Sequence, residues 1–156
     1  MNKLSVLQNV NTVFAHPYPH ICIDEALPQS IYDELDATFP EELICSTTPH
    51  DGGICYRYKA KECAQEAPPA IWQDFFAYHT SPEYFQECAK VFEPHIVEVY
   101  GDEFMHNMLT KDVSVRDVDT GGHYVTDCQF VVHEPVDSSG TSRTPHVDNP
   151  VEIYAG

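Results

Sequence analysis

Apolar residues recur at helical spacing in several segments between residues 27 and 100. From Leu27-Pro28 to Pro40 they return every fourth position and predict one amphipathic helix, with a stripe of Leu27, Ile31, Leu35 and Phe39. A second helix is predicted to begin at Pro68-Pro69. A third is predicted at Ser81-Pro82-Glu83, where the serine can cap, the proline suits the first turn and the glutamate faces the positive end of the helix dipole. A short fourth helix is predicted over residues 94–100, ending at Gly101.

From Lys111 onward the apolar period shortens to two, which is typical of strands. Strands are expected around residues 113–116 and 124–136, with further short strands at 21–23 and 151–154, whereas residues 41–66 are interpreted as irregular. Alternation in the long run predicts two faces, with Cys128, Phe130 and Val132 on one and Gln129, Val131 and His133 on the other. The fold class is therefore predicted as α+β, in one domain over 1–156 that is mainly helical over about 1–110 and β over 111–156.

The charge of the chain excludes some partners. With 25 acidic and 8 basic residues among 156, the formal net charge is -17, which repels a phosphate backbone and an anionic membrane surface. The 42% hydrophobic content indicates a globular chain. We therefore expect neither nucleic-acid binding nor membrane binding.

The sequence also indicates a compartment. It has no apolar run long enough to span a bilayer, and its first residues lack the pattern of a signal peptide. The cysteines are widely spaced, without a Cys-x-x-Cys pair, at Cys22, Cys45, Cys55, Cys63, Cys88 and Cys128. Such spacing favours reduced, mostly buried thiols over a zinc site or a disulfide framework, so a cytoplasmic location is expected.

Candidate chemistry is concentrated in the segment Thr144–Pro150, which contains His146-Val147-Asp148. In an extended segment, His146 and Asp148 point to the same face and can offer an imidazole nitrogen and a carboxylate oxygen to one metal ion. Together with one further histidine they would form the 2-His-1-carboxylate facial triad, which leaves open positions on Fe(II). The tripeptide alone is a weak signal.

Three segments together resemble the Fe(II)/2-oxoglutarate-dependent oxygenases, in particular their prolyl-4-hydroxylase-like branch. Residues 14–28 are similar to the opening segment of that family, with Pro17-Tyr18-Pro19-His20 followed by Asp24-Glu25-Ala26-Leu27-Pro28. Asp127-Cys128-Gln129 resembles the first strand of the family's double-stranded β-helix. Pro145-His146-Val147-Asp148-Asn149-Pro150 resembles its metal-binding strand.

The resemblance implies a fold and an activity. N-terminal helices would be followed by the first half of a double-stranded β-helix (jelly roll), in which His146 and Asp148 bind Fe(II) and Gln129 and Tyr154 line the 2-oxoglutarate pocket. Members of the family couple the decarboxylation of 2-oxoglutarate to succinate with hydroxylation of an unactivated C–H bond. The expected cofactors are Fe(II) and 2-oxoglutarate, with ascorbate as a further candidate, and the substrate is an unidentified protein or small molecule.

The chain departs from the family in one respect. The family's second histidine and a basic residue that binds 2-oxoglutarate come from strands downstream of His-x-Asp, whereas the eight residues after Asp148 include no His, Lys or Arg. The chain is therefore expected to be the N-terminal portion of such an enzyme, incomplete at its C-terminus and completed by a C-terminal half or by self-association. His133 and His123 are upstream alternatives for the third ligand.

Other interpretations of these residues stay open. The chain could be a non-catalytic interaction domain or a relict fragment of an oxygenase, or a zinc hydrolase that uses His146, Asp148 and another histidine, although no general base stands out nearby. The run Tyr56-Arg57-Tyr58-Lys59 and Arg143 could contact an anionic substrate or belong to solvated loops or an edge strand. Gln129 and Tyr154 could also serve in packing alone.

Overall fold

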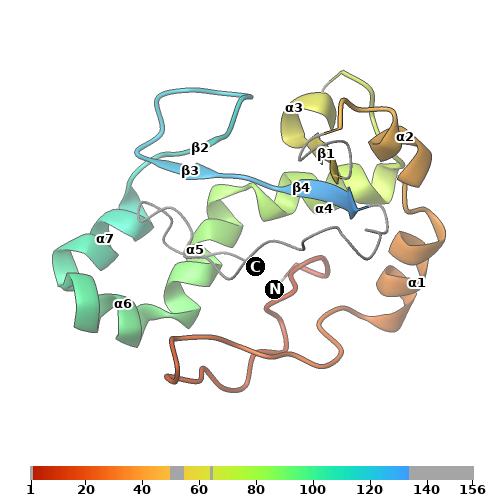
Figure 1. The fold of residues 1–156 in the computed structure, drawn as a ribbon. Coiled ribbons are helices and arrows are strands. Elements are labelled where there is room, and N and C mark those ends of the chain that lie inside the picture. The colour runs from red at the N-terminus through yellow and green to blue at the C-terminus, as the bar shows by residue number, and fades with distance from the viewer. Residues whose placement is uncertain (1, 50–54, 64, 134–156) are drawn as a thin grey trace, which may run out of the picture.

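The computed structural model describes residues 2–49, 55–63 and 65–133 and has an α+β fold, as predicted (Figure 1). Its helices are α1 (Gln29–Ala37), α2 (Glu41–Cys45), α3 (Ala60–Cys63), α4 (Ala70–His79), α5 (Pro82–Val91), α6 (Glu93–Tyr100) and α7 (Asp102–Thr110). Its strands are β1 (Cys55–Lys59), β2 (Val113–Val115), β3 (Tyr124–Thr126) and β4 (Gln129–His133). Within these described ranges, no helix combines the length and apolar character needed to cross a membrane.

The predicted helix boundaries are confirmed where the sequence provides a cap or a stop. The Ser81 hydroxyl accepts a hydrogen bond of 3.2 Å from the backbone N–H of Tyr84 and caps α5. Gly101 lies between α6 and α7 with φ of 84°, a conformation that favours glycine. In the first helix only Leu35 of the predicted stripe is buried, and Phe39 lies beyond the last residue of α1.

The strands form two separate pairs. β1 pairs with β4 in antiparallel fashion, with Arg57 opposite Val131 and Lys59 opposite Gln129. β2 pairs with β3 in parallel, and the short connection between them turns through Asp117 and Gly121, whose φ angles of 62° and 97° are both left-handed. The described strands thus make two two-stranded sheets.

Three sequence interpretations need correction. Residues 41–66 are not irregular, because α2, β1 and α3 all lie within them. The predicted strand at 21–23 is absent, and the backbone instead closes an isolated bridge between Phe14 and His20. The helix α7 was not predicted, although it carries two acidic residues in its first turn and an apolar pair, Met105 and Met108, three residues apart.

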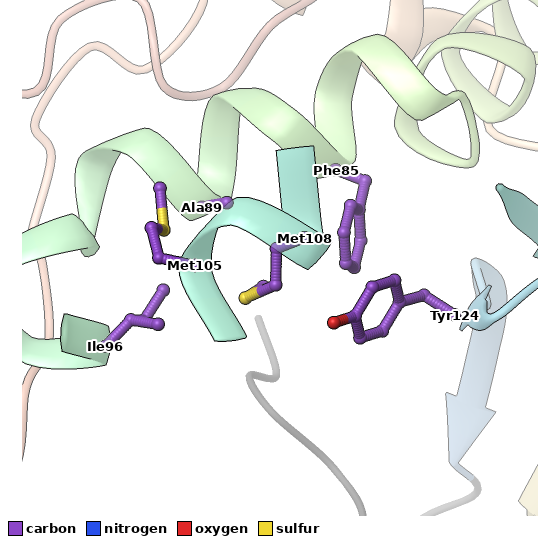
Figure 2. Packing of buried hydrophobic residues seen from close by; sticks show 6 residues of the cluster. All are labelled: Phe85, Ala89, Ile96, Met105, Met108 and Tyr124. Carbon is purple, nitrogen blue, oxygen red and sulfur yellow. The ribbon is translucent and has the colours of Figure 1, made fainter. Parts of the chain in front are cut away.

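Two clusters of buried residues hold the fold. The first joins α5, α6, α7 and β3, and consists of Phe85, Ala89, Ile96, Met105, Met108 and Tyr124. Figure 2 shows these side chains converging, with the rings of Phe85 and Tyr124 side by side at a centroid distance of 5.1 Å. The gathering of α5, α6 and α7 at one end of the molecule follows from this packing (Figure 1).

The second cluster joins α2 and α4 to the β1–β4 pair through Ile44, Phe76, Tyr58 and Phe130. Phe130 is its centre, because its ring lies 4.6 Å from that of Phe76 and 4.7 Å from that of Trp72, between centroids. The predicted apolar face of the long β run is confirmed here, since Cys128 and Val132 also pack against this cluster. One face of the β1–β4 pair is therefore covered by helices.

The N-terminal segment is attached to the helices by hydrogen bonds. The buried Ser5 hydroxyl donates a bond of 2.7 Å to a carboxylate oxygen of Glu87 in α5, and the phenol of Tyr78 in α4 donates a bond of 2.8 Å to the same oxygen. Further along, the Gln8 and Asn9 amides donate to the backbone carbonyls of Ala26 and Glu25. The first residues of the chain are thus tied to α4 and α5 through Ser5, and to the end of the segment that resembles the oxygenases through Gln8 and Asn9.

Candidate functional site

Of His146, Asp148, Gln129 and Tyr154, the residues predicted to bind Fe(II) or line the 2-oxoglutarate pocket, only Gln129 lies in the described part of the chain. His146, Asp148, Tyr154 and Arg143 lie outside the described residues. Gln129 is the first residue of β4, the last described strand before the His146-Val147-Asp148 segment. The site is therefore built from β4 and its partner β1.

The β1–β4 pair has two chemically different faces, because side chains alternate along each strand. Tyr58 and Phe130 are opposite each other on the helix-covered face, where they are 2% and 6% exposed. Three opposed pairs lie on the other face, which we call the arginine face; it comprises Cys55, Arg57, Lys59, Gln129, Val131 and His133. The sequence predicted that Gln129, Val131 and His133 lie on one face of the strand, and this register confirms it.

Two polar atoms on the arginine face are buried without a partner. They are the Nε of Arg57 and the Oε1 of Gln129. A buried polar atom without a hydrogen bond carries an uncompensated desolvation cost, commonly about 1–3 kcal/mol, and in a native protein calls for an explanation. Because Arg57 and Gln129 sit at diagonal positions of the antiparallel pair, both atoms belong to one small region.

The two upstream histidines considered as a third metal ligand lie in different places. His133 is exposed at the end of β4 on the arginine face, with its Nε2 4.0 Å from the Sγ of Cys55. His123 is exposed just before β3 in the other sheet, and its ring packs edge-on against Tyr124. In the described ranges no three His, Cys, Asp or Glu side chains gather into a metal-binding group, so these residues alone do not form one.

Two cysteines near β4, Cys63 and Cys128, are not activated thiols. Burial raises the pKa of Cys128 to about 12, and the neighbouring Asp127 carboxylate adds to the effect. Burial, followed by the charge of Glu62, raises the pKa of Cys63 to about 11. Both thiols therefore stay protonated at neutral pH, in which form they are poor nucleophiles and poor metal ligands. All six cysteines are free. Cys55 and Cys88 are buried, Cys63 and Cys128 are partly buried, and Cys22 and Cys45 are exposed, so the prediction of mostly buried thiols holds only in part.

A histidine outside this site is packed among aromatic rings. The Nδ1 of His79 lies 2.8 Å from the carbonyl oxygen of Phe75, its Nε2 is buried without a partner, and its ring centroid lies 3.9 Å from that of Phe75 and 4.4 Å from that of Tyr84. Burial lowers the pKa of His79, against smaller opposing effects of the Phe75 carbonyl and the Glu87 carboxylate. A neutral, structural imidazole follows from this environment.

The His79 environment predicts a pH-dependent stability. Because the pKa of His79 is lower in the folded chain than its unfolded value of about 6.5, the unfolded state takes up a proton first. The free energy of unfolding should therefore fall as the pH falls from about 6.5 toward the lowered folded value. Urea unfolding of the wild type and of His79→Gln between pH 7.5 and about 5 tests this. The difference between the two proteins should change over that window, and a constant difference would contradict the assignment.

A second surface feature offers little chemistry. A shallow depression of about 530 Å³ lies against α4 and the start of α5, and its lining includes Asp74, Tyr78 and Glu83 but no histidine or basic residue. The arginine face is the better candidate, because it combines cationic, amide and imidazole groups on one sheet surface.

The sequence interpretation named Arg57 only as part of the run Tyr56–Lys59 and did not place it beside Gln129. That run was interpreted as a contact for an anionic substrate or as part of a solvated loop or an edge strand, and its alternation of tyrosine with a basic residue is typical of a strand with one buried face. The edge-strand alternative agrees better with the structure, because the run lies within β1. The run alone could not reveal which strand pairs with it, because β4 is far away in sequence.

Comparison with models of known protein families, with curated proteins and with solved structures finds no match to this chain.

Proposed function

We propose that this chain belongs to an Fe(II)/2-oxoglutarate-dependent dioxygenase and contributes His146 and Asp148 as two ligands of the iron. The described β strands would then belong to the first half of a double-stranded β-helix. The main support in the sequence is the order of the three resembling segments, from residues 14–28 through Asp127-Cys128-Gln129 to Pro145–Pro150. An imidazole and a carboxylate two residues apart are a ligand pair suited to Fe(II).

The observation that carries the proposal is the two-faced β1–β4 pair. Helices α2 and α4 cover one face, and the other face presents Gln129 and Arg57 with unsatisfied buried polar atoms. A jelly-roll enzyme needs this division, with helices on the outer surface of the sheet and polar groups toward the interior. β4 is also the described strand that precedes the His146-Val147-Asp148 segment most closely.

The chain's own residues would then act by binding and positioning. His146 and Asp148 hold the metal, which when bound supplies the oxidising chemistry with dioxygen and 2-oxoglutarate. Gln129 lies on the same face of β4 as Val131, the residue opposite Arg57. Its side chain would orient the co-substrate by hydrogen bonding. The aromatic cluster around Phe130 keeps β4 in place from behind, so that these polar groups are held on a rigid element.

Anaerobic titration with Fe(II) tests the proposal. The chain should bind one Fe(II), and His146→Ala should weaken that binding at least about tenfold, because a ligand is removed. His106→Ala is the matched control, since His106 is an exposed histidine on α7 outside the site. It should leave the affinity unchanged. If His146→Ala and His106→Ala bind iron as well as the wild type, His146 is not a ligand.

The third ligand is tested in the same titration. His133→Ala should weaken iron binding if the upstream histidine on the arginine face completes the triad, whereas His123→Ala should not, because His123 lies beside the other sheet. Equal affinities for wild type and His133→Ala would indicate that the third ligand comes from a C-terminal half or from a second copy of the chain.

A non-catalytic interaction domain is the second candidate. It is favoured by exposed apolar side chains around β2 and β3, where Val118 and Val125 are 52% and 53% exposed. In that case the chain should self-associate or bind a partner through these residues with no dependence on His146. Sedimentation measured for the wild type, His146→Ala and Val125→Asp distinguishes the two functions, because only the interaction domain predicts a loss of association in Val125→Asp alone.

A further inference from the structure

A group of exposed aromatic rings lies in the connection between the N-terminal segment and α1 (Figure 1). Phe14 and Tyr18 are 47% and 67% exposed, and the ring centroid of His20 lies 5.2 Å from that of Phe14 and 5.5 Å from that of Tyr18. We call Phe14, Tyr18 and His20 the aromatic patch. Large aromatic side chains gain stability from burial, so a group of them left in water is typical of a surface that contacts a partner.

The aromatic patch is held in one conformation by its backbone. The N–H of Phe14 donates a hydrogen bond of 2.8 Å to the carbonyl oxygen of His20, and the N–H of His20 donates one of 2.9 Å in return. The Nδ1 of His20 lies 2.8 Å from the carbonyl oxygen of Tyr18. The chain just beyond the patch is also tied down, because the Asn9 amide donates a bond of 2.7 Å to the carbonyl oxygen of Glu25. A surface that is ordered before binding loses less conformational entropy when a partner binds.

The charge around the aromatic patch favours a cationic partner. Residues 4–56 contain eight acidic residues and no lysine or arginine. Asp24 and Glu25 follow His20 closely in sequence and are exposed, and within the described ranges neither of them forms an ion pair. The same negative charge repels nucleic acids and anionic membranes, which are other common partners of exposed aromatic rings. A cation, by contrast, is attracted both by carboxylates and by the faces of aromatic rings.

Among protein cations, a guanidinium suits this surface best. It is planar and stacks on an aromatic ring while its N–H groups remain free to donate to carboxylates, whereas an ammonium is a compact and strongly hydrated charge. We propose that the aromatic patch is a docking site for an arginine-rich segment of another protein. Arginine side chains stack on Phe14 and Tyr18, and the carboxylates of Asp24 and Glu25 offset their charge. The inference is independent of the proposed iron site, which shares no residue with the patch.

Titration of the full chain with a short, labelled Arg-Gly repeat peptide, followed by fluorescence anisotropy, tests the inference. We expect saturable binding, and weaker binding of two analogues, a Lys-Gly repeat and a peptide in which uncharged citrulline replaces arginine. Tyr18→Ala should weaken binding of the arginine peptide at least about threefold, and the double variant with Phe14→Ala at least about tenfold, because each change removes a stacking face. Tyr18→Phe should stay within about twofold of the wild type, since the ring is kept.

Tyr32→Ala is the matched control. Tyr32 is a tyrosine of α1 that is 56% exposed and belongs to the same stretch without basic residues, but it lies outside the aromatic patch. Its replacement should change the affinity less than about twofold, as is usual for a surface side chain away from a contact. Equal weakening by Tyr18→Ala and Tyr32→Ala would overturn the inference, and so would the absence of saturable binding to the wild type.

The peptide analogues and the metal complete the test. A lysine peptide that binds as tightly as the arginine peptide would assign the binding to general negative charge, and equal binding of the citrulline peptide would assign it to uncharged stacking. Either result overturns the arginine-rich partner. Binding should be the same with Fe(II) and with EDTA, and unchanged in His146→Ala. Peptide binding that requires Fe(II) would overturn the assignment to the aromatic patch, whereas a chain that binds the peptide through Tyr18 and binds no iron would contradict the proposed function alone.

Discussion

Phe130→Ala is expected to lower the free energy of unfolding by about 3–5 kcal/mol, the usual cost of removing a buried aromatic side chain. Phe130 is 6% exposed, and its ring centroid lies 4.6 Å from that of Phe76 in α4 and 6.3 Å from that of Tyr58 in β1. Its removal would leave a cavity that α4 and β1 cannot both fill. Urea unfolding followed by circular dichroism measures the change.

Val131→Ala provides the control for this prediction. Val131 is the next residue of β4, points to the opposite face and is 38% exposed, so its truncation should change the free energy of unfolding by less than about 1 kcal/mol. Similar losses for Phe130→Ala and Val131→Ala would mean that the second core cluster does not stabilise the β1–β4 pair.

The helices could be predicted largely because their signals are local. Ser81, Pro82 and Glu83 mark the start of α5 within three neighbouring residues, and Gly101 marks the end of α6 in the same way. Capping and backbone conformation act between residues close in sequence, so they can be read without knowledge of the fold. The faces of β4 were predictable for a similar reason, since alternation is a local property.

The pairing of the strands could not be predicted in this way. β1 is stabilised by its ladder with β4 and by α2, and its residues lie in a stretch whose turn-forming Asp51-Gly52-Gly53 suggested irregular structure. The parallel β2–β3 pair depends on the left-handed residues Asp117 and Gly121 and on close packing at Gly122, where an added Cβ would lie 2.7 Å from the Ser114 Oγ. Long-range pairing overrides local preference in both cases.

For the candidate site, sequence and structure contribute different residues. The sequence singled out His146, Asp148 and Tyr154, which lie outside the described residues, together with Gln129. The sequence named Arg57 only as part of the run Tyr56–Lys59, and the structure places it beside Gln129 through a strand pairing that no single motif reveals. The unsatisfied polar atoms of Arg57 and Gln129 can be recognised only in the structure, because the burial of one side chain depends on the others around it.

Asp148→Ala is expected to weaken Fe(II) binding at least about 100-fold. With Phe130→Ala, it is one of the two substitutions expected to have the largest effects. In the proposed site this carboxylate would offset the charge of the metal, so its loss would remove both a bond and a counter-charge. Asp119→Ala is a suitable control, because Asp119 is an exposed carboxylate whose described partner is the backbone N–H of Val115. Comparable losses in the two variants would assign the effect to the general negative charge of the chain.

In the proposed function, iron and 2-oxoglutarate share one site held by His146 and Asp148. The most direct test is to titrate Fe(II) anaerobically with and without saturating 2-oxoglutarate. We expect 2-oxoglutarate to tighten Fe(II) binding by at least about tenfold, and Fe(II) to tighten 2-oxoglutarate binding by the same factor, since coupling is reciprocal. The coupling should vanish in Asp148→Ala. Independent binding of the two ligands to the wild type, or binding of neither, would contradict the account.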